Sequence, residues 1–214
     1  VSGTLTVTRD DVGRLVISNG TETYPVTETE DGGAAAIAWT LNEAAANPAI
    51  DPSIPAQWAD FRGSETNNGV TGAPLPTAAQ DGTLYWANQL GVGFDSDAVG
   101  SPILVDGDII TYAGDKIYRV DTVSGEVKAK ANMDHKSSFS ITPPVYADGM
   151  VFVALSGGTV QAFNAATLES LWIYTDPLGG QPNCPLTVKN GYLYTGFWNS
   201  EVGDANFVCL SVTD

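Results

Sequence analysis

Short runs of alternating apolar and polar residues recur along the second half of the chain, and a tight turn divides each run. The turn dipeptides Asp106-Gly107, Asp148-Gly149 and Asn190-Gly191 follow one another at intervals of 42 residues. Asp-Gly and Asn-Gly favour two-residue β-hairpins, because both central positions of such a turn need a positive φ. The alternation on either side predicts half-buried strands, so three hairpins are expected in one register.

Each hairpin is followed by further strand-like runs. Residues 116–121, 159–164 and 206–211 are expected as third strands, and residues 126–133 and 169–176 as fourth strands. Four short antiparallel strands in about 42 residues are typical of one blade of a β-propeller, which buries its faces only against neighbouring blades. The competing interpretation is a β-sandwich with turns at regular spacing, but a sandwich does not require three turns in register.

An eight-residue run upstream of the first hairpin, TLYWANQL at residues 83–90, has the character of a fourth strand. Its Trp86 aligns with Ala129 and Trp172 at intervals of 43 residues. The run precedes its own first three strands, so its partners are not evident. We expect an exposed edge, or pairing with residues 1–50 or with a second chain.

The repeat resembles that of the pyrroloquinoline-quinone (PQQ) enzymes, roughly Tyr-Ala-Leu-Asp-x-x-Thr-Gly-x-x-x-Trp. YRVDTVSGEVKAK (118–130) and QAFNAATLESLWIY (161–174) carry it, with Ala129 in place of the tryptophan and Leu168 in place of the glycine. The stretch WADFRGSETNNGVTG (58–72) is similar to the Trp-x-x-Phe-Arg-Gly opening that precedes the first blade in the non-enzymatic branch of this family. The resemblance implies a PQQ-like propeller and gives little information about activity.

The pattern divides the chain into three parts. Residues 1–50 do not fit the repeat and are expected as a small β-rich segment of four short strands, with a helix over residues 34–46 as the competitor because alanine favours it. Residues 51–57, in a proline-rich stretch, are expected as a linker. Residues 58–214 hold about three to three and a half blades, fewer than the four to eight of a closed ring. The predicted fold class is therefore all-β, a partial β-propeller of four-stranded antiparallel blades, and we interpret it as a piece of a longer protein.

Charge and cysteine content narrow the choice of partners. The formal net charge is −16, from 25 acidic against nine basic residues, which argues against nucleic acid and anionic lipid. No run approaches the roughly 18 apolar residues of a membrane span, and the first residues lack a signal-peptide pattern. The composition favours an extracellular or cell-envelope location, with a signal or anchor outside this segment. Cys184 and Cys209, on the first and third strands of one blade, fit either one disulfide or two buried thiols.

Motifs of enzyme chemistry are absent from the sequence. There is no Gly-x-Ser-x-Gly, phosphate loop, His-Glu-x-x-His or Cys-x-x-Cys, and His135 is the only histidine. Asp95 and Asp97 lack the glycine and terminal glutamate of a calcium loop. We therefore expect no cofactor, no metal and no catalysis, and predict a binding or scaffold propeller for a protein or carbohydrate ligand that could self-associate through open blade edges. The alternatives are a quinoprotein dehydrogenase-like enzyme, for which the resemblance implies a calcium site and a catalytic aspartate, and a propeller hydrolase or lyase.

Any binding surface should lie on one face of the blades. The chain reverses at each turn, so the connections after second and fourth strands share a face, and these are the longer loops. Long loops on a rigid scaffold are where recognition usually occurs. The loop at residues 198–206 exceeds its counterparts by about six residues. The candidate binding residues on this face are Phe94, Asp95, His135, Phe139, Trp198, Asn199 and Glu201.

Overall fold

The computed structural model describes residues 6–9, 15–18, 23–25, 29–31, 34–36, 49–72, 82–93, 97–137 and 142–213. The chain divides into two compact units, Val1–Ala46 and Asn47–Asp214. In the first unit β1 (Thr6–Arg9), β2 (Leu15–Ser18) and β3 (Thr23–Pro25) form one antiparallel sheet, and β4 (Thr29–Asp31) pairs with β5 (Ala34–Ala36). Strand β5 lies at the start of the region where strand and helix competed, and most of that region falls outside the described residues.

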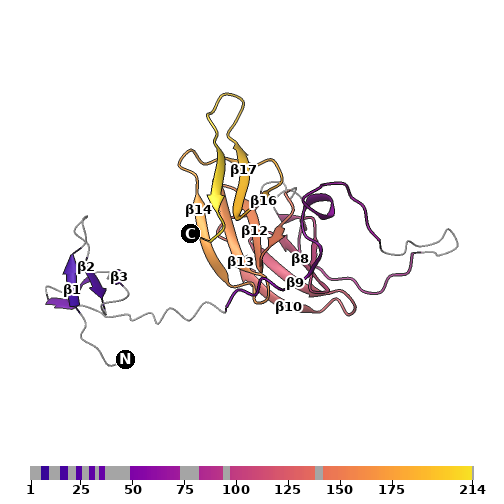
Figure 1. The fold of residues 1–214 in the computed structure, drawn as a ribbon, viewed down its shortest axis with the longest axis horizontal. Coiled ribbons are helices and arrows are strands. Elements are labelled where there is room, and N and C mark those ends of the chain that lie inside the picture. Colours follow the sequence, from indigo (N-terminus) through magenta and orange to yellow (C-terminus); the bar gives the residue numbers. More distant parts are fainter. Residues whose placement is uncertain are drawn as a thin grey trace. The chain divides into compact units, whose positions relative to one another are not determined.

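The described residues of the second unit form three antiparallel sheets, which we call blades 1, 2 and 3 (Figure 1). Blade 1 consists of β7 (Ile103–Val105), β8 (Asp108–Ala113), β9 (Lys116–Asp121) and β10 (Val127–Asn132). Blade 2 consists of β11 (Val145–Ala147), β12 (Met150–Leu155), β13 (Thr159–Asn164) and β14 (Ser170–Thr175). Blade 3 consists of β15 (Gln181–Pro182), β16 (Thr187–Lys189), β17 (Tyr192–Trp198) and β18 (Phe207–Ser211). The predicted class, an all-β partial propeller of four-stranded antiparallel sheets, is confirmed.

The three hairpin turns have the backbone geometry that their sequences predict. Asp106, Asp148 and Asn190 have φ values of 53°, 49° and 53°, and the glycine that follows each of them also has a positive φ. Two consecutive positive φ values match the twist of the flanking strands in a two-residue hairpin. The first and second strands of each blade are therefore held in the same register across all three repeats.

Apolar side chains fill the junctions between successive blades. The middle strands β12 and β13 are buried along their whole length, because blade 2 is covered on both faces. One core joins blade 1 to blade 2, and its buried members include Ile103, Ile110, Tyr112, Ile117, Val151, Val153, Leu155 and Phe163. A second core joins blade 2 to blade 3, and its buried members include Met150, Phe152, Val160, Ala162, Leu186, Leu193 and Phe197. Each blade thus depends on its neighbour for burial.

Residues 51–65 form a strap across the first strands of all three blades. Strand β6 (Ala56–Trp58) pairs with β7 of blade 1, so part of the expected linker belongs to the sheet. The Tyr146 amide of blade 2 donates to the Ala59 carbonyl at 2.7 Å. The Lys189 ammonium of blade 3 lies 2.6 Å from a Glu65 carboxylate oxygen. A short 3₁₀ turn, η1 (Phe61–Gly63), lies within the strap.

Residues 83–90 do not form the strand that the sequence predicts. They dock through side chains instead: the Trp86 indole N–H donates to the Thr122 carbonyl at 3.0 Å, and the Asn88 amide donates to the Gly125 carbonyl at 2.9 Å. A strand needs a backbone ladder with a neighbour, and none of the described strands pairs with this segment. Across the described ranges, no helix is long and apolar enough to cross a membrane.

Candidate functional site

The loops that follow second and fourth strands meet on one face of the blades, here called the loop face. They are joined by short backbone hydrogen bonds. The Gly158 amide in the turn after β12 donates to the Gly180 carbonyl at 2.8 Å, and the Asp176 amide donates back to the Gly158 carbonyl at 2.9 Å. The Ser156 amide donates to the Lys136 carbonyl at 2.8 Å. The loops of blades 1, 2 and 3 therefore form a continuous surface.

A buried carboxylate anchors the insertion that follows β17 on this face. Asp176, 2 % exposed, accepts hydrogen bonds from the Asn206 side-chain amide at 3.0 and 3.1 Å, the Tyr174 hydroxyl at 3.0 Å and the Leu178 amide at 2.9 Å. Burial opposes ionisation of Asp176 and is the largest single influence, but these donors together lower the pKa of the carboxyl below its ordinary value. The carboxylate therefore stays charged and ties blade 2 to the start of β18.

The insertion between β17 and β18, residues 199–206, is held at both ends. The Asn199 side-chain amide donates to the Leu178 carbonyl at 2.9 Å and to the Asp204 carbonyl at 3.3 Å. The Phe197 amide donates to the Asn206 carbonyl at 3.2 Å. The loop extends beyond the end of its sheet (Figure 1), and its tip is solvent-exposed. The loop therefore combines a fixed base with an exposed tip, and a loop that is already ordered loses less conformational entropy when it makes a contact.

The structure brings some of the predicted site residues to this face and does not describe others. Trp198 is 44 % exposed at the end of β17. The Asn199 side chain holds the base of the insertion through its hydrogen bond to Leu178, and Glu201 lies in the exposed part of the insertion. His135 lies on the same face next to Gly157 and contacts Asp134 through Nδ1 at 2.7 Å. Phe94, Asp95 and Phe139 lie outside the described residues.

Sequence reasoning missed the residues that fix and surround the loop. Asp176 and Asn206 form the anchor, and Leu178 and Val202 add exposed apolar surface, with exposed fractions of 43 % and 95 %. Asp176 is the last residue of a predicted fourth strand, and Asn206 begins a predicted third strand. Polar residues at strand ends that share a face were therefore the available signal.

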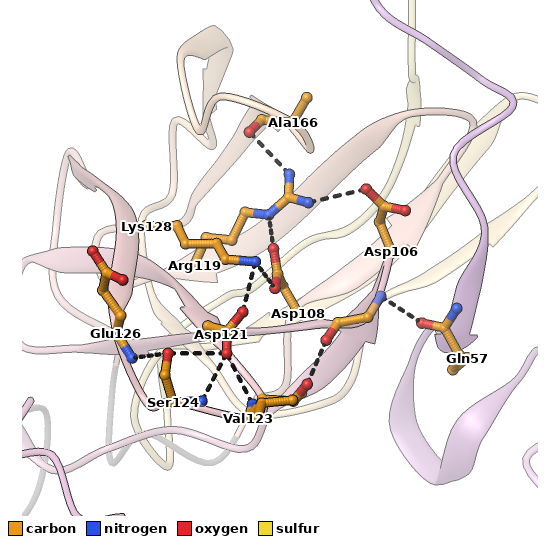
Figure 2. A network of polar contacts seen from close by, with 12 residues as sticks. Gln57, Asp106, Asp108, Arg119, Asp121, Val123, Ser124, Glu126, Lys128 and Ala166 are labelled. Atoms are coloured by element: carbon orange, nitrogen blue, oxygen red, sulfur yellow. Dashed lines mark hydrogen bonds and ion pairs between the residues drawn. The ribbon is translucent and has the colours of Figure 1, made fainter.

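A charged network occupies the opposite face, between blades 1 and 2 (Figure 2). The Arg119 guanidinium donates through Nε to Asp108 at 2.7 Å and through Nη2 to Asp106 at 3.3 Å. Lys128 donates to Asp108 and contacts Asp121, at 2.7 and 2.8 Å. Burial is the largest influence on Asp108 and opposes its ionisation, but the hydrogen bonds from Lys128 and Arg119 together lower its pKa. Hydrogen bonds from Lys128 and Ser124 likewise lower the pKa of Asp121.

Arg119 takes the place of the tryptophan that the repeat lacks at Ala129. In blade 2 the cross-strand pair is Ala162 with Trp172, and in blade 1 the equivalent pair is Arg119 with Ala129, so large and small side chains have exchanged strands. The Trp172 indole donates to the Val212 carbonyl of blade 3 at 3.1 Å. Arg119 Nη1 donates to the corresponding carbonyls of blade 2, Ala165 at 3.1 Å and Ala166 at 2.9 Å. Both junctions thus retain a hydrogen bond to the residue that follows the third strand of the next blade.

The two cysteines are free thiols, so the disulfide alternative is not realised. The Cys184 thiol contacts the backbone of Gly196 on one side of β17, whereas Cys209 lies in β18 on the other side, opposite Tyr194. Two strand spacings, about 10 Å, exceed the separation that a disulfide can bridge. Cys209 is also exposed, so the alternative of two buried thiols is wrong for that residue.

The three repeated blades, with apolar cores at their junctions and long loops on one face, define a partial β-propeller. A family model described as "Outer membrane protein assembly factor BamB" matches residues 75–202. The chain belongs to this family of PQQ-like repeat proteins. No curated protein matches the sequence.

Solved structures with similar folds include enzymes and an assembly factor. The quinohemoprotein alcohol dehydrogenase of Comamonas testosteroni has 17% identity and a TM-score of 0.47, and the match covers 71% of this chain and 24% of that one. A europium-containing methanol dehydrogenase has 16% identity and a TM-score of 0.46, over 57% and 25%. BamB from Moraxella catarrhalis has 17% identity and a TM-score of 0.35, over 43% and 29%. The chain spans about a quarter of the length of these structures.

Proposed function

We propose that the chain is a non-catalytic binding or scaffold segment of a cell-envelope or exported protein, and that it holds a protein partner on the loop face. The observation that carries the proposal is the anchored insertion at residues 199–206. Its base is fixed by Asp176 and Asn199, while its tip and its neighbour Trp198 remain exposed. Core packing does not require this loop, because the equivalent turns after β8 and β12 join their strands with two and three residues. The family description, an assembly factor, supports a protein partner and an envelope location.

The quinone that the fold family implies does not fit the described residues. Pyrroloquinoline quinone is a tricarboxylic acid, so a site for it needs cationic donors aimed into a cavity. In the described part of the chain, the one largely buried cation is Arg119, and it already donates to two carboxylates and two carbonyls. The described stretches contain no cluster of three or more His, Cys, Asp or Glu side chains able to hold a metal ion.

The proposal is tested by shortening the insertion. Residues 200–205 are replaced by Gly-Gly, which keeps both Asn199 and Asn206, and the chain and the variant are each immobilised. Detergent-solubilised bacterial outer-membrane proteins are applied with a cross-linker and identified by mass spectrometry. We expect a partner whose recovery falls at least about tenfold with the shortened loop, the scale of loss when a central contact is removed. Equal recovery on both surfaces would overturn the proposal, as would alcohol-dependent dye reduction by the chain supplied with the quinone and calcium.

A further inference from the structure

Residues 83–90 occupy the place of a fourth strand, although no third strand lies beside them. The Trp86 indole donates to the carbonyl of Thr122, the residue that follows the third strand of blade 1, at 3.0 Å. The Trp172 indole, in the fourth strand of blade 2, donates to the carbonyl of Val212, the residue that follows the third strand of blade 3, at 3.1 Å. These contacts are equivalent, so residues 83–90 lie against blade 1 as β14 lies against blade 3.

Blade 3 presents the complementary edge. Among the described strands, β18 pairs with β17 alone and has no fourth strand beside it. In blade 2, Val160 and Ala162 of the third strand are fully buried in the core shared with blade 3. Phe207 and Cys209 occupy the equivalent positions of β18, and both are exposed, Phe207 to 75 %. In the described part of the chain, blade 3 is therefore covered on one face only.

The two edges match in side-chain size. In blades 1 and 2, one cross-strand position between the third and fourth strands holds one large and one small residue. These pairs are Arg119 with Ala129 and Ala162 with Trp172. At this position β18 has the small residue Cys209, and residues 83–90 have the large residue Trp86, which precedes Ala129 by 43 residues. Residues 83–90 placed beside β18 in this register would complete a third such pair.

One chain cannot join its own two edges, because blade 2 lies between them and packs against blade 1 on one face and blade 3 on the other. A second copy of the chain supplies both edges. We propose that two copies associate head to tail, with residues 83–90 of each copy forming the fourth strand of blade 3 in the other. Two sets of three blades give six, within the range of four to eight for closed propellers. A two-fold axis makes the two junctions identical and closes the ring.

Blade 1 has room for the side chain that this junction would bury. A cavity of about 220 Å³ lies beside residues 83–90. Its lining includes Trp86, Leu90, Pro102, Ile109 and Val120. Within the chain, Val160 of blade 2 and Leu193 of blade 3 share one core. Their equivalents across the proposed junction are Phe207 and Ile109, so the cavity is where Phe207 of the second copy would be buried.

Sedimentation velocity tests the assembly. The unaltered chain is measured at about 150 mM salt, which screens the net charge of −16 on each copy. Between about 1 and 100 µM we expect a rise to twice the chain mass of 22.4 kDa. Cys209→Trp places two large side chains opposite each other and should weaken the dimer at least about tenfold. The matched control is Glu169→Trp, exposed in the turn after β13 of blade 2, which should change the dissociation constant less than about twofold.

A disulfide trap tests the register and shows which chain donates the strand. Ala87 and Val208 should face each other, as Ile173 faces Gln161 in blade 2. Opposed residues have Cα atoms about 4.5–5.5 Å apart, which a disulfide can bridge. The double variant Ala87→Cys, Val208→Cys should therefore form a link between two chains under mild oxidation, seen by non-reducing electrophoresis and mapped by mass spectrometry. Ala87→Cys alone is the control, because Cys209 projects from the other face of β18.

The unaltered chain gives a third readout. Cys209 should react with a thiol reagent freely in dilute solution and more slowly as the dimer forms, because it then takes the buried position that Ala162 has in blade 2. The inference is overturned if the unaltered chain stays monomeric throughout or if Cys209 reacts equally fast at every concentration. A dimer that Cys209→Trp does not weaken, or a disulfide between positions 87 and 208 formed within a single chain, would also contradict it.

Discussion

Replacing Arg119 by alanine should destabilise the junction between blades 1 and 2 by about 3 kcal/mol. The Arg119 and Asp108 side chains are only 10 % and 5 % exposed, and removing one partner of a buried ion pair costs about 3–5 kcal/mol. The variant also leaves the Ala165 and Ala166 carbonyls without their charged donor. Lys128 continues to hold Asp108, which keeps the expected loss at the lower end of this range.

A second substitution tests whether Arg119 replaces the hydrogen bond and the packing that a tryptophan at position 129 would provide. The double variant Arg119→Ala, Ala129→Trp recreates the Ala–Trp pair that blade 2 has at residues 162 and 172. An indole at position 129 can donate to the Ala165 carbonyl, as Trp172 donates to Val212. We therefore expect the double variant to recover about half of the lost free energy of unfolding, or roughly 1.5 kcal/mol, the size of one buried hydrogen bond together with the side-chain packing.

The assay is urea denaturation at neutral pH, followed by circular dichroism, with the free energy obtained by linear extrapolation. Lys130→Ala is the matched control, because Lys130 is an exposed cation of the neighbouring strand β10. It should change the free energy by no more than about 0.5 kcal/mol. A loss below about 1 kcal/mol for Arg119→Ala would refute the buried-pair reasoning. A double variant no more stable than the single one would refute the equivalence with tryptophan.

Three further outcomes are expected. Asp176→Asn should lower the free energy of unfolding at neutral pH. The pKa of Asp176 is lower in the folded state, so the stabilisation by its carboxylate is present above the unfolded pKa near 3.8 and is lost as the pH falls through the folded pKa. The free energies of unfolding of the two proteins, measured by urea denaturation, should therefore converge in acid. A thiol reagent should titrate two thiols in the native chain, Cys209 faster than Cys184; a count of zero would contradict the free-thiol assignment. Gly125→Ala should cost more than about 1 kcal/mol by thermal unfolding, because Gly125 has φ +74° and an added Cβ would meet the Trp86 ring; a neutral result would show that Trp86 does not dock there.

The blades could be predicted because their signals are local. Asp106, Asp148 and Asn190 each encode their own turn, and alternation in the next few residues encodes the strands. The strap could not be predicted in this way, since its contacts join residues as far apart as Glu65 and Lys189. Residues 83–90 were wrongly predicted as a strand. Their local pattern is that of a strand, but a strand forms only when a neighbouring strand supplies backbone hydrogen bonds.

The candidate site was predicted in the same partial manner. The excess length of the loop after β17 led to Trp198, Asn199 and Glu201 as candidates; the structure places them at this loop, and their role in binding stays a prediction. Its anchor at Asp176 depends on a contact with Asn206, 30 residues further on, which periodicity does not reveal. The role of Arg119 could have been predicted from the sequence. Blade 2 has a small residue at 162 and a tryptophan at 172, whereas blade 1 has the large residue Arg119 and the small residue Ala129 at the equivalent positions.

The strap has a consequence for the order in which the molecule folds. Each blade forms through contacts within about 42 residues, whereas the strap contacts residues up to 124 positions away. The entropy cost of closing such a long loop is offset only when the blades that the strap contacts have formed. Until then the backbone edge of β7 is unpaired and can add a strand from another molecule. Once β6 has docked, the same hydrogen-bonding groups are used within the chain. The strap therefore acts last in folding and removes an aggregation-prone edge that the earlier steps leave open.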